Sequence, residues 1–498
     1  MAVIEEQATY VRPRRNLKLW GAIGLSLGIV GPTLAMAGNG QVTVASVGKS
    51  VPLVFLFGAV GIGIIAHGFI RLTQRYNHAG SAYALVGVTV GPRAGFFSGF
   101  AIIGTYTMFC SCCVAAVNSF LNAFIAAAQN EPAHPFRVPW IWTILVCVAL
   151  SAFLNTRDLR LVTRMLLAIE GIGVLCMTIL SIVIFAKGGA KATGIDGGVF
   201  SLSHVSFSTV VAAVVAAFLS WAGFEGCAAL GEETDDPTRN IPRALTGSIV
   251  FTGILFVIVM FAQTVGFGTN AAGQKAFTSS GDSLSVLSHN YIGLWFSLVI
   301  SFAAVMSAFA CHLASSATAG RLLFAYSRDG FGPKPFGRLT GPHQAPINAI
   351  YTVLAFALVA NVISWASGRP VLGTGDPSLD SYFYFATIGA IMLMIAYLMV
   401  EVGAVMHLYK VRIAEVIVPL VGIAIIVLVF YYNLKGQHTI KAPPYIAFMW
   451  AGLGLVIAWA APGLAQQVGR KLAQELDEPA GKDLPMELGE GLASGSGS

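Results

Sequence analysis

Charged side chains are scarce in this sequence. Only 10% of the 498 residues are Asp, Glu, Lys or Arg, whereas 56% are hydrophobic. A soluble particle of this size needs a larger polar surface, so the composition excludes a water-soluble enzyme. The excess of Lys and Arg (29) over Asp and Glu (23) indicates orientation in a lipid bilayer, and we expect no nucleic-acid partner.

Motifs of enzymes and metalloproteins are also missing. The polar segments contain no HExxH motif, no nucleophile motif and no paired catalytic carboxylates. Cysteines number seven, and Cys110, Cys112 and Cys113 lie within one apolar run. Neither a disulfide framework nor a zinc site is therefore predicted. We expect a protein that is not an enzyme and that holds no metal and no cofactor.

Apolar runs between polar breaks predict twelve membrane-spanning helices, each near the roughly 20 residues that a bilayer requires. They cover residues 18–44, 51–72, 93–128, 138–155, 163–187, 206–231, 244–268, 291–320, 346–366, 381–408, 414–433 and 443–463. If the chain starts in the cytoplasm, 21 of the 29 Lys and Arg residues fall on the cytoplasmic side, as the positive-inside rule predicts. We expect a multi-pass protein of the cytoplasmic (inner) membrane with both termini in the cytoplasm.

Two of these spans contain glycine in their middles. Span 1 carries Gly28 and Gly31 followed by Pro32, and span 6 contains the stretch Trp-Ala-Gly-Phe-Glu-Gly at 221–226. Proline lacks an N–H group and clashes with the preceding helical turn, so span 1 is expected to unwind there. Interrupted helices at matching positions of two halves with opposite topology indicate an inverted-repeat transporter with a site near the bilayer midplane.

Three segments on the predicted cytoplasmic side resemble a known family. Residues 223–225 read Gly-Phe-Glu and are followed by Gly-Glu-Glu-Thr-Asp-Asp-Pro at 231–237 and Asn-Ile-Pro-Arg-Ala at 240–244. Residues 316–333, followed by 345–346, form the second match, and residues 79–83 with 91–96 form the third. Together these segments are similar to the amino acid–polyamine–organocation (APC) superfamily. Within it, the span 8 segment and residues 419–422 look most like bacterial amino acid permeases and putrescine importers.

The resemblance implies an all-α polytopic membrane protein with the leucine-transporter (LeuT) fold. Its two inverted repeats would be residues 18–187 (spans 1–5) and 206–408 (spans 6–10), with spans 1 and 6 unwound. Residues 414–463 would form two peripheral helices. Residues 1–17 and 464–498 would be cytoplasmic tails, the latter ending in an artificial-looking Ser-Gly linker. The implied activity is import by alternating access of a small molecule, carried out by a monomer or a homodimer.

Ionisable side chains inside spans are costly, so they mark candidate functional residues. Glu225 follows the predicted break in span 6, where it can carry a coupling proton or meet an ammonium group; the alternative is a neutral acid bonded within the bundle. Glu170 stands in the middle of span 5, where some proton-coupled relatives carry lysine. A carboxylate there can titrate as a proton-coupling group, contact a sodium ion or receive one amine of a diamine. His312 on span 8 is expected to lie opposite Glu170 as a proton relay, or else to be structural. The remaining three, His67, Glu401 and His407, are interpreted as snorkelling or interfacial residues.

A charged loop follows span 6. Its acidic residues, at positions 232, 233, 235 and 236, stand beside Arg239 and Arg243. This loop either latches the cytoplasmic side by ion pairs or is a solvated helix end.

Substrate recognition is expected at the two breaks. Exposed backbone N–H groups at Ile29, Val30 and Gly31, near Thr33, suit a carboxylate at the positive end of a half-helix. Residues 221–225 would complete the site from span 6. Aromatic rings that suit an ammonium group are Tyr106, Trp221, Phe224 and Tyr384. With Gly223 and Glu225 these residues are the predicted substrate site.

The sequence alone identifies neither the substrate nor the coupling ion. Two buried carboxylates suit a diamine, whereas the donors of span 1 suit an amino acid, which we favour. Sodium needs several oxygen ligands, and 309–311 on span 8 lacks hydroxyls while Ser315 and Ser316 lie close to the cytoplasmic end. We therefore favour proton coupling, with amino acid exchange as an alternative. An ion channel or a receptor is disfavoured, because no filter-like repeat or soluble domain is present.

Overall fold

The fold is a bundle of helices. The computed structural model describes residues 17–76, 78–129, 136–436 and 442–460, and in that part of the chain no β-strand forms. The predicted tails at 1–17 and 464–498 fall outside it, apart from Leu17.

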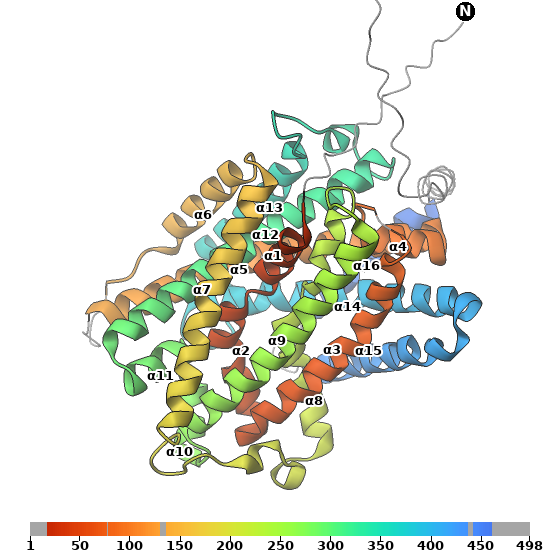
Figure 1. The fold of residues 1–498 in the computed structure, drawn as a ribbon. Coiled ribbons are helices and arrows are strands. Elements are labelled where there is room, and N and C mark those ends of the chain that lie inside the picture. Colours follow the sequence, from red (N-terminus) through yellow and green to blue (C-terminus); the bar gives the residue numbers. More distant parts are fainter. Residues whose placement is uncertain (1–16, 77, 130–135, 437–441, 461–498) are drawn as a thin grey trace, which may run out of the picture.

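Sixteen α-helices are present in the described residues (Figure 1). In chain order they are α1 (Leu19–Val30), α2 (Pro32–Val47), α3 (Val51–Thr73), α4 (Ala82–Thr89), α5 (Pro92–Gln129), α6 (Trp140–Leu154), α7 (Leu159–Ala186), α8 (Phe207–Phe218), α9 (Pro237–Phe267), α10 (Ala271–Thr278), α11 (Ser283–Tyr291), α12 (Leu294–Arg328), α13 (Ile347–Ser367), α14 (Pro377–Val411), α15 (Ile417–Gly436) and α16 (Ala442–Ala460). Short 3₁₀ helices include η4 (Leu219–Trp221), η5 (Phe224–Leu230) and η7 (Ile413–Val416).

The number of membrane crossings is partly supported by these helices. Nine stretches of the described residues are long and apolar enough to span a bilayer. The first, Leu19–Thr73, joins predicted spans 1 and 2, whereas α6 is short and predicted span 6 is divided between α8, η4 and η5. The protein is therefore a polytopic helical membrane protein, and the count of twelve spans with a 5+5 repeat stays a prediction.

Helices that are five spans apart in the predicted order pack against each other. The pairs are α3 with α9, α5 with α12, α2 with α8, and α1 with η5. Figure 1 shows α3 and α9 running side by side through the bundle. Contacts between corresponding elements are what two repeats related by a two-fold axis would make.

Helix α5 runs through the interior, where it packs against α12 and α14. Helix α1 lies against α7, because Gly24 has no side chain: a Cβ there would be 2.6 Å from the carbonyl oxygen of Thr163. Close approach at glycine is a common means of packing helices in lipid. Large apolar side chains such as Ile172 and Trp459 are exposed on the outer faces, as expected of surfaces that contact lipid.

Candidate functional site

Span 1 is interrupted at Gly31, where the sequence predicts a break. Gly31 has φ 55° and ψ 62°, a left-handed conformation that ends α1, and Pro32 begins α2. Only glycine adopts this conformation at little cost, and proline at the first helical position needs no hydrogen-bond acceptor. The N–H group of Leu34, in the first turn of α2, donates to Ser307 Oγ of α12 at 3.1 Å. The break thus exposes the positive end of a buried half-helix.

Span 6 is interrupted at the matching place. Helix α8 ends at Phe218 and continues as η4 to Trp221. Ala222 is then extended (φ −58°, ψ 128°), and Gly223 is left-handed with φ 91°. The chain continues as the 3₁₀ helix η5, whose first turn carries Glu225. The local glycine therefore places an acidic side chain directly after an unwound segment.

The two breaks contact each other. Ser26 Oγ of α1 donates to the carbonyl oxygen of Phe224 at 2.8 Å and accepts from the N–H of Cys227 at 3.3 Å. Asn39 Nδ2 of α2 donates to Ser220 Oγ at 2.9 Å. Ser26 satisfies backbone groups of the interrupted segment, and both contacts hold the unwound segments together.

Glu225 is fully buried and accepts two hydroxyl hydrogen bonds. Tyr106 of α5 donates to Oε1 at 2.6 Å, and Tyr397 of α14 donates to Oε2. The structure brings Tyr106 and Glu225 together, as their placement in one predicted site requires. Tyr397 is not among the predicted residues. It is one of fourteen tyrosines in the chain, and no local pattern marks it.

Glu170 of α7 is also buried, beside the break in span 1. Its Oε1 accepts from Ser307 Oγ at 2.8 Å, and its carboxyl group faces the backbone of Thr33. Oε2 and Thr33 Oγ1 have no hydrogen-bond partner among the described residues. Ser307 is a second site residue that is not among the predicted ones. It lies one turn before Cys311, so its hydroxyl group faces the break although residues 309–311 carry none.

His312 does not meet Glu170. Its Nδ1 contacts the carbonyl oxygen of Cys110 at 2.8 Å, on α5, and its ring also faces the backbone of Cys147 on α6. Because Glu170 bonds to Ser307 instead, the expected relay between His312 and Glu170 is not present in this arrangement. A proton-coupling role for His312 has no support from its contacts.

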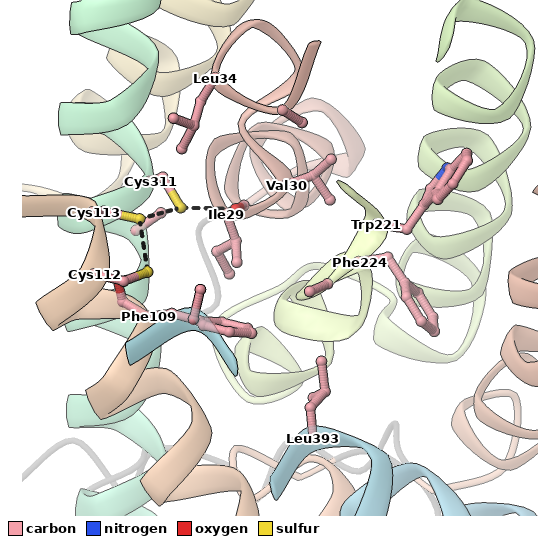
Figure 2. Close-up of a cluster of buried hydrophobic side chains, with 14 of the residues drawn as sticks. Ile29, Val30, Leu34, Phe109, Cys112, Cys113, Trp221, Phe224, Cys311 and Leu393 are labelled. Carbon is pink, nitrogen blue, oxygen red and sulfur yellow. Dashed lines mark hydrogen bonds between the residues drawn. The ribbon is translucent and has the colours of Figure 1, made fainter. Parts of the chain in front are cut away.

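A small cavity lies next to the break in span 1. Its volume is ≈ 30 Å³, room for about one or two water molecules, so it is too small to hold an amino acid. The lining is mostly apolar and consists of Ile29, Val30, Leu34, Ala35, Asn39, Phe109, Cys112, Cys113, Leu219, Ala222, Cys311, Tyr382 and Ala386. No acidic side chain belongs to it. Figure 2 shows Ile29 beside the thiols of Cys113 and Cys311, and Cys311 donates to the carbonyl oxygen of Ile29 at 2.9 Å.

The predicted aromatic residues are placed differently from one another. Trp221 packs against Phe55 and Phe256, and the ring of Phe224 packs against Tyr397. Neither side chain lines the cavity. Tyr384 is partly exposed on α14, whereas Tyr382 lines the cavity two residues earlier. The tyrosine that the cavity uses is thus two positions away from the predicted one.

Ion pairs close one end of the bundle, which we call the basic end because it carries Arg71, Arg157 and Arg321. Arg328 of α12 donates to both carboxyl oxygens of Glu232, at 2.7 and 2.9 Å. His78 lies 3.6 Å from Glu232, and Arg321 donates to Glu233 at 3.1 Å. The acidic loop is therefore a latch, defined by Glu232, Glu233, Arg321 and Arg328, and its basic members come from α12.

The latch also holds the start of α1. The N–H of Leu17 donates to the carbonyl oxygen of Glu233 at 3.0 Å, and the N–H of Asp235 donates back to Leu17 at 2.8 Å. These two hydrogen bonds therefore join the segment before span 1 to the loop after span 6.

The charge of Glu232 is set by this environment. Burial raises the pKa of its carboxyl, but His78 and Arg328 lower it further, to about 2. A depressed folded-state pKa contributes stability at pH values above the ordinary 4.5, and the contribution is lost as pH falls through about 2.

Glu232→Gln is therefore expected to lower the free energy of unfolding by roughly 3 kcal/mol at pH 7. The difference from the wild type should shrink as the pH falls from 4.5 towards 2. Thermal unfolding followed with a thiol-reactive dye measures this, because all seven cysteines are buried. Asp196→Asn, in the partly exposed pair Lys49–Asp196, is the control and should leave the melting temperature unchanged. Equal melting temperatures for Glu232→Gln and the wild type at pH 7 would contradict a closed latch.

The three residues interpreted as interfacial are not alike. His67 is partly exposed and lies 3.8 Å from Glu415, and His407 packs on the ring of Tyr76. Glu401, in contrast, is 0% exposed, so its interpretation as a snorkelling residue is wrong.

Comparisons with known proteins show similarity to amino acid and polyamine permeases. Residues 17–458 match the family model described as amino acid permease. The branched-chain amino acid permease BcaP of Lactococcus lactis is 25% identical over 361 residues, covering 68% of this chain and 73% of that protein. The low-affinity putrescine importer PlaP of Escherichia coli K12 is 24% identical over 354 residues, covering 70% and 75%. Cationic amino acid transporter 3 of Arabidopsis thaliana is 23% identical over 345 residues, covering 66% and 54%.

Proposed function

The chain belongs to the amino acid permease family of the APC superfamily, and from this premise we propose that it imports a neutral, apolar amino acid together with a proton. The family is one of membrane permeases, not of enzymes. The observation that carries the choice of substrate is the cavity between the two breaks, which is lined by apolar side chains and thiols and by no acidic residue.

Electrostatics favour a zwitterionic amino acid over a diamine. A diamine carries two positive charges and needs acidic partners, but both oxygens of Glu225 are taken by tyrosine hydroxyls, and Glu170 is bonded to Ser307. An amino acid needs one anion site and one cation site. The helix dipole at the N-terminus of α2 favours the first and that at the C-terminus of α1 favours the second, with the side chain in the apolar cavity.

The coupling proton is assigned to Glu225. An ionised Glu225 accepts hydrogen bonds from both Tyr106 and Tyr397, whereas a protonated one must rearrange at least one of them. Binding and release of a proton thereby change the contacts between η5, α5 and α14. In this scheme the latch closes the cytoplasmic side, the protein lies in the cytoplasmic membrane, and both termini are cytoplasmic, as the distribution of basic residues favours.

Uptake into proteoliposomes tests the proposal. The purified protein is reconstituted with an alkaline interior in sodium-free buffer, and leucine, valine, alanine, arginine and putrescine are compared. We expect accumulation of leucine or valine that a protonophore abolishes, and little uptake of arginine or putrescine. Accumulation that requires sodium would instead assign the unpartnered oxygens of Glu170 and Thr33 to a sodium site.

A polyamine importer is the second candidate function, which the similarity to the putrescine importer favours. A thermal-shift screen separates the two, because a ligand that binds the folded state raises its melting temperature. Stabilisation by putrescine and not by leucine would reverse our assignment.

A further inference from the structure

The carboxyl group of Glu401 occupies a slot between three helices. It projects from α14, and a Cβ placed on Gly68 of α3 would lie 2.4 Å from its Oε1. A Cβ on Gly422 of α15 would lie 3.1 Å from Oε2. The carboxyl therefore fits only because two neighbouring helices present glycine to it.

No side chain among the described residues donates a hydrogen bond to this carboxyl. Glu401 is 0% exposed, and neither of its oxygens has a hydrogen-bond partner among the described residues, although the backbone of Gly68 lies beside it. A buried polar group that merely supports a fold is normally hydrogen-bonded. An unpaired acidic group inside a membrane protein is instead typical of a proton or ion pathway.

Glu401 stands between Glu225 and the basic end. Tyr397 lies one turn earlier on the same face of α14, and its hydroxyl donates to Glu225. On the other side, His67 adjoins Gly68 on α3, and its Nε2 is 3.8 Å from Glu415 Oε2. Glu415 is partly exposed on η7 and lies 2.8 Å from Arg71 Nε.

The charged and titratable groups on the elements around Glu401 are few. Helix α3 contributes His67 and Arg71, and η7 contributes Glu415. On its own helix, His407 and Lys410 lie further towards the basic end, and residues 417–430 of α15 contain no titratable side chain.

We propose that Glu401 is a second proton-binding site, which receives the proton that Glu225 releases and passes it to the basic end. The proposal rests on the proton-coupled function proposed above. The O–H bond of protonated Glu225 breaks and its electron pair stays on the carboxylate. The proton passes along the hydroxyl of Tyr397, with water, and forms an O–H bond on the Glu401 carboxylate. That bond then breaks, and His67 and Glu415 deliver the proton to solvent.

The test compares Glu401→Gln with the wild type in proteoliposomes that contain a pH-sensitive dye. Accumulation driven by the pH gradient, and the proton flux that accompanies it, should fall at least about tenfold. Counterflow of labelled against unlabelled leucine requires no net proton transfer and should be retained. Asp376→Asn, at the N-cap of the same helix, is the matched carboxyl-to-amide control and should behave as the wild type.

Glu401→Asp supplies the second arm, because it keeps a titratable group one methylene shorter. It should retain proton-driven uptake with a shifted pH of half-maximal rate, and an unshifted pH profile overturns the proposal whether or not Glu401→Gln folds. Wild-type accumulation and proton flux in Glu401→Gln also overturn it, as does loss of counterflow in a folded Glu401→Gln protein. Absence of gradient-driven uptake in the wild type is a different result, since it refutes proton coupling itself.

Discussion

Glu225→Gln is expected to abolish accumulation driven by a pH gradient while sparing exchange of substrate across the membrane. Glutamine fills the same volume and can still accept from Tyr106 or Tyr397, but it cannot bind and release a proton. The loss should reach at least about a hundredfold in the gradient-driven rate if Glu225 is the coupling residue. The measurement is the initial rate of labelled leucine uptake into proteoliposomes, with counterflow determined on the same preparation.

Two outcomes would contradict this role of Glu225. One is gradient-driven uptake in Glu225→Gln with an unchanged pH dependence, which would make Glu225 a neutral structural acid. The other is loss of both uptake and counterflow in a protein whose melting temperature is normal, which would place the residue in substrate binding. Asp376→Asn serves again as the control for a carboxyl-to-amide change away from the site.

Gly223→Ala is expected to destabilise the protein and to reduce uptake at least about tenfold. An L residue at φ 91° costs roughly 1–3 kcal/mol. The added Cβ would also lie 2.1 Å from Cγ2 and 3.2 Å from Cβ of Ile29, and overpacking of this kind costs roughly another 1–3 kcal/mol. Because the clash falls between the two interrupted spans, it should disturb the site as well as the fold. Melting temperature and leucine counterflow measure the two effects.

Gly171→Ala provides the matched control. Gly171 lies in the middle of α7, and a Cβ there would meet nothing within 4 Å. Alanine is favoured over glycine in a helix by roughly 1 kcal/mol, so this variant should be at least as stable as the wild type. The double variant Gly223→Ala with Ile29→Ala should recover the part of the stability that the clash removes. Wild-type melting temperature and uptake in Gly223→Ala would show that position 223 tolerates a side chain and needs no glycine.

Residues whose role depends on the local chain were predictable. Gly31 and Pro32 break span 1 because of their own covalent structure, and Gly223 does the same for span 6. Glu225 could be singled out because an acidic residue after such a break is rare in an apolar sequence. The cavity, by contrast, is lined by Tyr382 where the sequence suggested Tyr384, because rotation of α14 against α5 decides which ring faces inward.

Residues whose role depends on distant partners were not predictable. Glu232 pairs with Arg328, 96 positions away, although Arg239 and Arg243 are much closer along the chain. Tyr397 reaches Glu225 across 172 positions. Glu401 was assigned to the interface because Lys410 is nearby in sequence, yet it is buried because α3 and α15 cover it.

The sequence by itself determined that this protein resides in a membrane, where two spans break, and that Glu170 and Glu225 lie inside. Those properties follow from composition, backbone chemistry and the cost of charge in lipid, which act residue by residue. Only the tertiary structure decided which hydroxyl groups bond to Glu225 and Glu170, which cations close the latch, and which carboxyl meets no side-chain donor among the described residues. Each of these depends on how helices far apart in the chain are rotated and packed, and hydrophobic periodicity specifies the apolar side of a helix but not its neighbour.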